Sequence, residues 1–155
     1  MDRPIELLVF SVQNLVFGAY AGHVASVAQS GERYALSDDG IFFFLHSGEE
    51  IRGLDFMVWL RRCSGQNDYG GEHIRTLPST LLFIQPPDCV YRAVRIDEVK
   101  EFLTVSLDRL HTFPLFMQQR CQAVALWGIA RHKDRLIPLI DLSKLSMAQQ
   151  GDIAV

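Results

Sequence analysis

The histidine and cysteine residues of this chain are the side chains best suited to metal binding or nucleophilic catalysis. Cys63 and His73 are ten positions apart and Cys121 and His132 are eleven apart, whereas zinc sites use C-x2-C or H-x3-H spacing. The sequence has no Gly-x-Ser-x-Gly elbow for a nucleophile and no glycine-rich loop for a phosphate. We therefore expect a protein without catalytic activity, bound metal or cofactor.

Two aspartates remain as candidates for chemistry, because Asp55 and Asp141 end equivalent apolar stretches of an internal repeat. The segments 46–56 and 132–142 align without a gap, each residue matching the residue 86 positions later, and a His, an Ile and the Asp coincide. An aspartate that follows a buried strand commonly caps the next turn or helix. We therefore expect both aspartates to act as caps.

A small β-barrel that binds a ligand or catalyses a reaction is the alternative interpretation of these residues. It requires that His46 and His132 converge with one of the two aspartates in a pocket. The positions of the two histidines in the fold therefore test it.

Repeated hairpins are the elements expected to position these residues. Residues 6–20 are rich in Leu, Val, Phe and Tyr, with Gln13-Asn14 as the turn, and residues 81–94 repeat the pattern about 74 positions later around two prolines. After the last strand, the helix formers of residues 142–150 predict a short C-terminal helix capped by Asp141.

A polar, glycine-rich segment separates the two repeated units. We place the first unit at about 5–60, the connection at 61–79 and the second unit at 80–150, within a single domain spanning 1–155. The fold class is mainly β. Many short strands with frequent turns favour closed small barrels, because closure removes unpaired strand edges.

Composition and charge restrict the classes of partner. The 155 residues are 48% hydrophobic and 21% charged, which is a globular composition. The net charge of −3, with no basic cluster beyond Arg61-Arg62, argues against nucleic acid. Apolar runs such as 15–21 and 41–45 are far below the roughly 20 residues of a spanning helix, and no signal peptide pattern occurs. We expect a cytoplasmic protein with reduced cysteines and no direct membrane insertion.

The apolar run from Ile41 to Leu45 contains three consecutive phenylalanines. Such a run usually indicates a strand that is buried on both faces. A small barrel, however, buries only alternate positions. One face, either that of Phe42 and Phe44 or that of Phe43, is therefore expected to need a partner surface.

The second half of the chain resembles the CheW-like domain, which is found in the chemotaxis adaptor CheW and as the regulatory domain of the histidine kinase CheA. Residues 96–103 resemble the "V-D-x-V-x-x-V-L" strand of the family, and residues 107–114 resemble the loop that follows it. Residues 126–129 followed by 134–142 fit the ending "G-V … R-L-I-x-L-I-D-L" with its spacing. The resemblance covers residues 81–145.

The first half resembles the same family in outline, with residues 17–27 lying on its "Y-G-I-x-I-x-x-V-x-E-I" stretch. It departs from the family at several positions. Ser26 replaces the glutamate, Ser47 replaces the arginine of "N-L-R-G", and Phe42 replaces a glycine that usually precedes that motif. The family's "V-P-V-I-D-L" becomes the sequence of residues 51–56, Ile-Arg-Gly-Leu-Asp-Phe.

The resemblance implies two intertwined five-stranded SH3-like β-barrels around a shared core, with a short C-terminal helix. It implies a non-catalytic adaptor that couples the cytoplasmic tip of a chemoreceptor, a methyl-accepting chemotaxis protein, to the regulatory domain of a CheA-type histidine kinase. Such proteins work in the cytoplasm of bacteria or archaea, where they are recruited to receptor arrays.

The resemblance and the apolar run together give a set of expected partner-binding residues. These are Val24, Ser26, Phe42, Phe44, Ser47, Ile51 and Arg52. Because the departures from the family concentrate in the first unit, a second hypothesis is a CheW-like scaffold of another pathway, such as twitching motility, that has lost the usual partner. A ligand-binding barrel is the third hypothesis.

Overall fold

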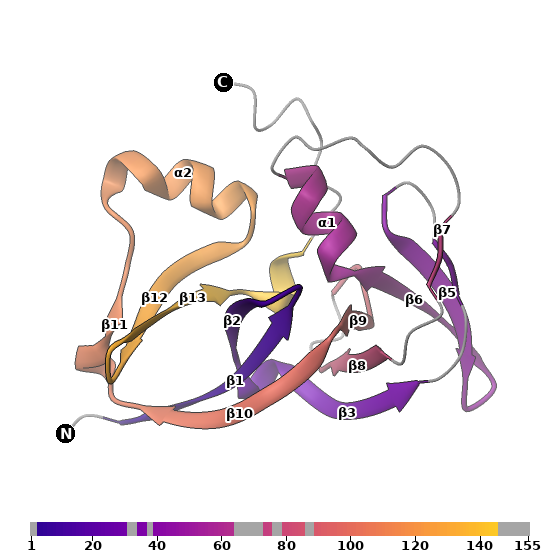
Figure 1. Cartoon of the computed structure of the whole chain (residues 1–155), viewed down its shortest axis with the longest axis horizontal. Helices are drawn as coiled ribbons and strands as arrows, with labels where there is room; N and C mark the ends of the chain where they lie inside the picture. The colour runs from indigo at the N-terminus through magenta and orange to yellow at the C-terminus, as the bar shows by residue number, and fades with distance from the viewer. Residues whose placement is uncertain are drawn as a thin grey trace.

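The computed structural model describes residues 3–30, 34–36, 39–63, 73–75, 79–85 and 89–145 (Figure 1). The strands are β1 (Ile5–Val12), β2 (Leu15–Tyr20), β3 (Val24–Ser30), β4 (Tyr34–Leu36), β5 (Ile41–His46), β6 (Glu49–Asp55), β7 (His73–Arg75), β8 (Ser79–Ile84), β9 (Ala93–Ile96), β10 (Glu98–Val105), β11 (Leu110–His111), β12 (Leu126–His132) and β13 (Arg135–Ile140). The helices are α1 (Phe56–Cys63) and α2 (Leu115–Ala123), with 3-10 turns η1 (Ala21–His23), η2 (Leu107–Arg109) and η3 (Leu142–Lys144).

Two large sheets form the molecule, and each contains strands from both halves of the chain. A six-stranded sheet, which we call the terminal sheet, has the order β10-β1-β2-β13-β12-β11. A five-stranded sheet, the central sheet, has the order β3-β8-β9-β6-β5, and β4 pairs with β7 separately. The first hairpin, β1–β2, therefore completes the C-terminal unit, and the hairpin β8–β9 completes the N-terminal unit. The predicted intertwined arrangement is confirmed, and the short β11 gives one sheet a sixth strand.

Contacts between strands that are not neighbours show that both sheets curl. In the central sheet, β5 and β8 are separated by two strands, yet the rings of His46 and Phe83 have centroids 4.7 Å apart. In the terminal sheet, Arg135 Nη2 on β13 lies 2.7 Å from Glu101 Oε1 on β10. Each sheet thus rolls toward closure, as expected for small barrels.

The internal repeat corresponds to two equivalent hairpins. β5–β6 and β12–β13 pair antiparallel, and the inner strand of each then pairs in parallel with a strand of the other half. β6 pairs with β9 through Gly53 and Ala93, and β13 pairs with β2 through Leu139 and Gly18. The two copies of the repeat therefore occupy corresponding places in the two sheets.

Among the described residues, three apolar cores hold the sheets together, and the one with the most residues lies between the two sheets. β1 is buried on both faces, because Leu7 and Val9 pack inside the terminal sheet whereas Leu8 and Phe10 pack in the shared core. Its continuous apolar run is the pattern expected of such a strand. Each large apolar side chain that is fully buried contributes roughly 1.5–3 kcal/mol.

Both longer helices were missed by the sequence analysis, which placed no helix at 56–63 or 115–123. The predicted C-terminal helix begins as the 3-10 turn η3, with Asp141 as its N-cap. The rest of that predicted helix, the two prolines of the second hairpin and most of the predicted connection lie outside the described residues.

Candidate functional site

The expected partner-binding residues lie on the two edge strands of the central sheet and on the strand next to one edge. Val24 and Ser26 lie on β3, and Phe44 lies on β5 at the opposite edge. Ser47 lies in the turn after β5, and Arg52 lies on β6. Edge strands have unpaired backbone groups on one side, which makes them accessible to another chain.

Two of the expected contact residues are core residues. Phe42 is fully buried and Ile51 is 7% exposed, so the expectation that they touch a partner was wrong. Alternation places Phe42 inside the barrel, with Val58 and Leu81 around it. An apolar side chain in that position stabilises the fold and offers no surface to a partner.

The burial of Phe42 explains how the chain tolerates the loss of the family's glycine. Phe42 pairs across the strands with Gly53, and a Cβ added at Gly53 would lie 2.4 Å from the Phe42 ring. In the repeated hairpin the corresponding pair is Gly128 with Leu139, so there the large side chain lies on the other strand. The two hairpins therefore fill the same position from opposite strands.

The remaining residues of the edges approach one another where the central sheet curls. Ser26 on β3 is exposed and pairs with Phe83 on β8. The Phe83 ring lies 6.1 Å from the Phe44 ring and 4.7 Å from the His46 ring, measured between centroids. The structure thus brings Ser26 and Phe44 to the same region through Phe83, a residue that sequence reasoning did not select.

Ser47 lies at the exposed tip of the β5–β6 hairpin. Ser47 and Gly48 have φ values of 52° and 81°, the positive values that a two-residue type I′ hairpin turn requires. Space around Gly48 is open, because a Cβ added there would meet nothing within 4 Å. Ser47 is exposed, so the residue at the family's arginine position lies at an open hairpin tip.

Arg52 faces the other side of the hairpin, with exposed apolar residues beside it. Its guanidinium lies 5.3 Å from the centroid of the buried Tyr91 ring, within cation–π range. Burial raises the pKa of the Tyr91 hydroxyl, and the Arg52 charge partly opposes that shift. Phe43, the cross-strand partner of Arg52, is 57% exposed and Leu45 is 74% exposed. We call Phe43, Leu45, Ser47 and Arg52 the hairpin surface.

A second exposed apolar surface lies on the first turn of α2, where sequence reasoning identified no site. Leu115 is 85% exposed, Phe116 is 84% exposed and Met117 is 40% exposed. Three consecutive apolar residues directly after Pro114 were the available signal. We call these three residues the helix surface. It belongs to the terminal barrel, and Figure 1 shows α2 and the β5–β6 hairpin at opposite ends of the long axis.

Both aspartates of the repeat are caps, as predicted. Asp55 Oδ1 accepts hydrogen bonds from the backbone N–H groups of Met57 and Val58, each at 3.1 Å, at the start of α1. Its other oxygen accepts a bond from the Arg95 guanidinium at 2.7 Å, in a buried ion pair. Asp141 Oδ1 accepts a bond from the backbone N–H of Ser143 at 3.0 Å.

The two histidines of the third hypothesis lie in different sheets. His46 ends β5 of the central sheet, whereas His132 ends β12 of the terminal sheet. The catalytic or ligand-binding arrangement that needed both histidines is therefore not formed. Within the described ranges, no group of three or more His, Cys, Asp and Glu residues could hold a metal ion.

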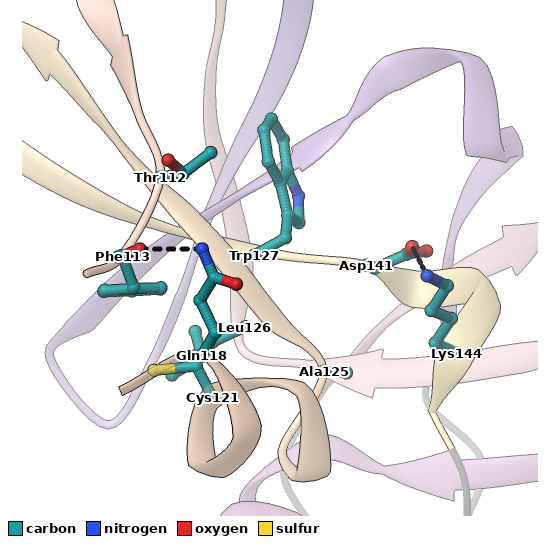
Figure 2. Close-up of a pocket in the computed structure, with 9 residues that line it drawn as sticks. All are labelled: Thr112, Phe113, Gln118, Cys121, Ala125, Leu126, Trp127, Asp141 and Lys144. Atoms are coloured by element: carbon teal, nitrogen blue, oxygen red, sulfur yellow. Dashed lines mark hydrogen bonds and ion pairs between the residues drawn. The ribbon is translucent and has the colours of Figure 1, made fainter. Parts of the chain in front are cut away.

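A cleft of about 460 Å³ lies between α2, β12 and η3 (Figure 2). Trp127 stands in it between Thr112 and Asp141, and Gln118 reaches toward it from α2. No residue of the expected partner-binding set lines this cleft.

Comparison with solved structures identifies the fold. The structure is similar to that of the scaffolding protein TtCheW from Thermoanaerobacter tengcongensis, with 18% sequence identity, a TM-score of 0.63 and 90% of each chain covered. No protein-family model and no curated protein matches the sequence. The chain therefore has the CheW-like fold, as its strand motifs predicted. No helix in the described part of the chain is long and apolar enough to span a membrane.

Proposed function

We propose that this protein is a non-catalytic scaffold that couples the cytoplasmic tip of a chemoreceptor to the regulatory domain of a CheA-type histidine kinase. The CheW-like fold, shared with a protein described as a scaffolding protein, supports a chemotaxis adaptor role in general. Beyond this general role, we propose the receptor and the kinase as the two partners and a cytoplasmic location at receptor arrays.

The observation that carries the proposal is the presence of two exposed apolar surfaces on two different barrels. The hairpin surface and the helix surface lie at opposite ends of the molecule, so two proteins can be bound at once (Figure 1). Val24, Ser26 and Phe44 extend the docking region from the hairpin toward the β3 edge. Apolar side chains exposed next to polar ones are typical of protein interaction sites.

A scaffold of this kind transmits a signal through differences in contact energy. Binding shifts a kinase between its on and off states only if the scaffold has different affinities for the two states. The two barrels share one core, so displacement of one barrel is transmitted to the other.

A related scaffold in another pathway, such as twitching motility, is the second candidate, and Ser47 is the observation that favours it. Replacing arginine by serine at the hairpin tip removes a charge and up to five donors. A carboxylate on a partner would lose a charge-assisted hydrogen bond worth about 1.5–3 kcal/mol. The usual kinase contact would then be weaker by a factor of ten or more.

Binding assays with variants of the two surfaces test the proposal. Purified protein is titrated with the regulatory domain of the CheA-type kinase from the same genome and, separately, with a receptor tip fragment. Leu45→Glu places a charge on the hairpin surface and Phe116→Glu places one on the helix surface; Leu136→Glu, at another exposed apolar residue, is the matched control.

We expect each surface variant to lower the affinity for one partner by about tenfold or more and to leave the other partner bound, because charges at the centre of an apolar contact are costly. The control should bind both partners normally. Absence of kinase binding at tens of micromolar by the folded wild-type protein would exclude the kinase role and favour the second pathway. Equal effects of all three variants would show that neither surface is specific.

A further inference from the structure

The cleft beside α2 contains a fixed carboxylate whose outer oxygen is available to a ligand. Asp141 Oδ1 is held by the backbone N–H of Ser143 at 3.0 Å and by the Ser143 hydroxyl at 2.5 Å. Asp141 Oδ2, by contrast, accepts no hydrogen bond from the described residues; Lys144 Nζ lies 3.9 Å from it, and His23 Nδ1 lies 3.7 Å from Oδ1. The carboxylate is therefore oriented by its capping role while one oxygen stays open.

Lys144 is poorly placed to neutralise that oxygen permanently. Its side chain is 76% exposed, and 3.9 Å is longer than a hydrogen bond. Exposed ion pairs of this kind contribute little, because a flexible side chain must be held in one position in water. A ligand cation can therefore replace the Lys144 ammonium at small cost.

A second acceptor directed into the cleft is the side-chain amide of Gln118; the Thr112 hydroxyl and the Trp127 indole also line the cleft. Gln118 Nε2 donates a hydrogen bond to the carbonyl oxygen of Phe113 at 3.1 Å, which leaves its amide oxygen to accept from a ligand. In Figure 2 this amide oxygen and the Asp141 carboxylate lie on either side of Trp127. A ligand that satisfies both groups must donate hydrogen bonds and carry positive charge.

Trp127 and the apolar wall beside it determine which kind of cation fits the cleft. An indole face next to a carboxylate favours an organic cation, because the ring attracts positive charge and also packs against apolar groups. Leu126, Cys121 and Ala125 supply the apolar wall. The volume of about 460 Å³ is within the range of small-molecule sites.

We propose that this cleft binds a small organic cation with an apolar body, its ammonium or guanidinium group between Asp141 and Trp127. The proposal does not require the scaffold role, because neither the hairpin surface nor the helix surface lines the cleft, although Gln118 directly follows the helix surface on α2. The same chemistry is offered by a free amine and by an arginine side chain of a peptide.

Two-dimensional NMR of the tryptophan indole N–H groups tests the proposal directly. The chain has two tryptophans, and Trp59 is buried in the shared core, so it serves as an internal reference. The ¹⁵N-labelled full chain is titrated with phenylethylammonium, with the neutral 2-phenylethanol and with the anionic 3-phenylpropionate. A separate titration with a capped arginine dipeptide distinguishes a free amine from a side chain.

We expect phenylethylammonium to shift the Trp127 signal saturably and to leave the Trp59 signal in place. Asp141→Asn should weaken binding by about tenfold or more, because it removes the charge and keeps the capping oxygen. Lys144→Ala should tighten binding by removing the competing ammonium. Asp134→Asn, which makes the same charge change in the β12–β13 turn, should bind like the wild type.

Four results would overturn the proposal. These are no saturable shift up to about 10 mM, equal binding of the neutral alcohol, unchanged affinity in a folded Asp141→Asn variant, or preference for the anion with loss of binding in Lys144→Ala. Binding of the arginine dipeptide but not of phenylethylammonium would assign the cleft to a partner's side chain and overturn the free-amine form. If Asp141→Asn fails to fold, Trp127→Leu, which removes the aromatic face, replaces it; binding is then followed on the backbone amide signals of Ala125 and Leu126, with the same expected loss.

Discussion

Asp55 and Asp141 occupy the same position of the repeat, yet their surroundings differ. Asp55 is 1% exposed and pairs with Arg95, whereas the Asp141 side chain is partly exposed and faces the cleft. The difference follows from strand register, because Asp55 lies opposite Arg95 in the parallel pairing of β6 with β9. In the terminal sheet the equivalent pairing ends one residue earlier, at Ile140 and Ala19.

Removing the two carboxylates should therefore have unequal effects on stability. Asp55→Ala leaves Arg95 as a buried charge and also removes the α1 cap, so we expect a loss of roughly 3–5 kcal/mol in the free energy of unfolding. Asp141→Ala removes a cap on a 3-10 turn, and about 1 kcal/mol is expected. Urea unfolding of both variants measures the difference, and equal losses would contradict a structural role for the Arg95 pair.

Capping by both aspartates was predictable from sequence, because it depends on neighbouring residues. The ion pair was not, because Asp55 and Arg95 are 40 positions apart and meet only through a parallel strand pairing. Which side chains of the candidate site are buried was likewise not predictable from the sequence. The five apolar residues from Ile41 to Leu45 do not reveal which face points inward, and Phe42 proved to be in the core whereas Phe43 is exposed.

At the scale of elements, the hairpins β5–β6 and β12–β13 have the same backbone arrangement but place the large side chain of an equivalent residue pair on opposite strands. The pair Phe42 and Gly53 and the pair Gly128 and Leu139 each combine one glycine with one large apolar residue. What is preserved is the filled volume between the strands, because voids and overlaps are both costly.

A double-mutant cycle at this pair should reveal strong coupling. Phe42→Gly leaves a cavity and should cost about 3–5 kcal/mol, as large aromatic truncations do. Gly53→Leu alone should also destabilise, because its side chain would overlap the Phe42 ring. The double variant recreates the arrangement of the other hairpin, and we expect it to recover about 1–3 kcal/mol relative to the sum of the single changes. Additive losses in chemical unfolding would contradict this compensation.

Strands were predicted better than helices, and the distribution of apolar residues in the two helices explains why. α1 begins with four consecutive buried residues, Phe56 to Trp59, which in sequence look like a continuation of β6. α2 has its large apolar residues in one block at its start, and only the small Cys121 is buried further along, so it has no broad helical stripe facing the core. Period-based reasoning therefore had no signal for α2, and the buried run at the start of α1 concealed the helical period of that segment, whereas the turn at Gln13 and Asn14 was explicit in the sequence.

At the scale of the whole molecule, neither half of the chain can complete a sheet alone. β1 pairs with β10 and β2 pairs with β13, so the first hairpin obtains both of its outer partners from the second half. The shared core likewise takes residues from both sheets. The two barrels consequently form one cooperative unit, which suits a scaffold that must hold two partners in a fixed relation.

A chain divided after residue 68, between α1 and β7, should demonstrate this dependence. We expect the two fragments to be unfolded separately, because each would expose the unpaired apolar strands of an incomplete sheet. Mixed at equal concentration, they should regain the β-sheet circular dichroism and the dispersed amide NMR spectrum of the intact protein. A fragment that shows cooperative unfolding by itself would contradict the prediction.

Each sheet takes one hairpin from the other half of the chain, and this arrangement delays strand pairing during translation. β1, with its apolar residues Leu7 to Phe10, leaves the exit tunnel well before its neighbour β10 (Glu98–Val105) and the partner of β2, β13 (Arg135–Ile140), are synthesised. Contacts this distant in sequence form slowly, because a long loop must close first. Until those strands are made, the apolar hairpin β1–β2 lacks both of its outer partners, and the yield of the protein in the cell should depend on chaperones that bind such segments.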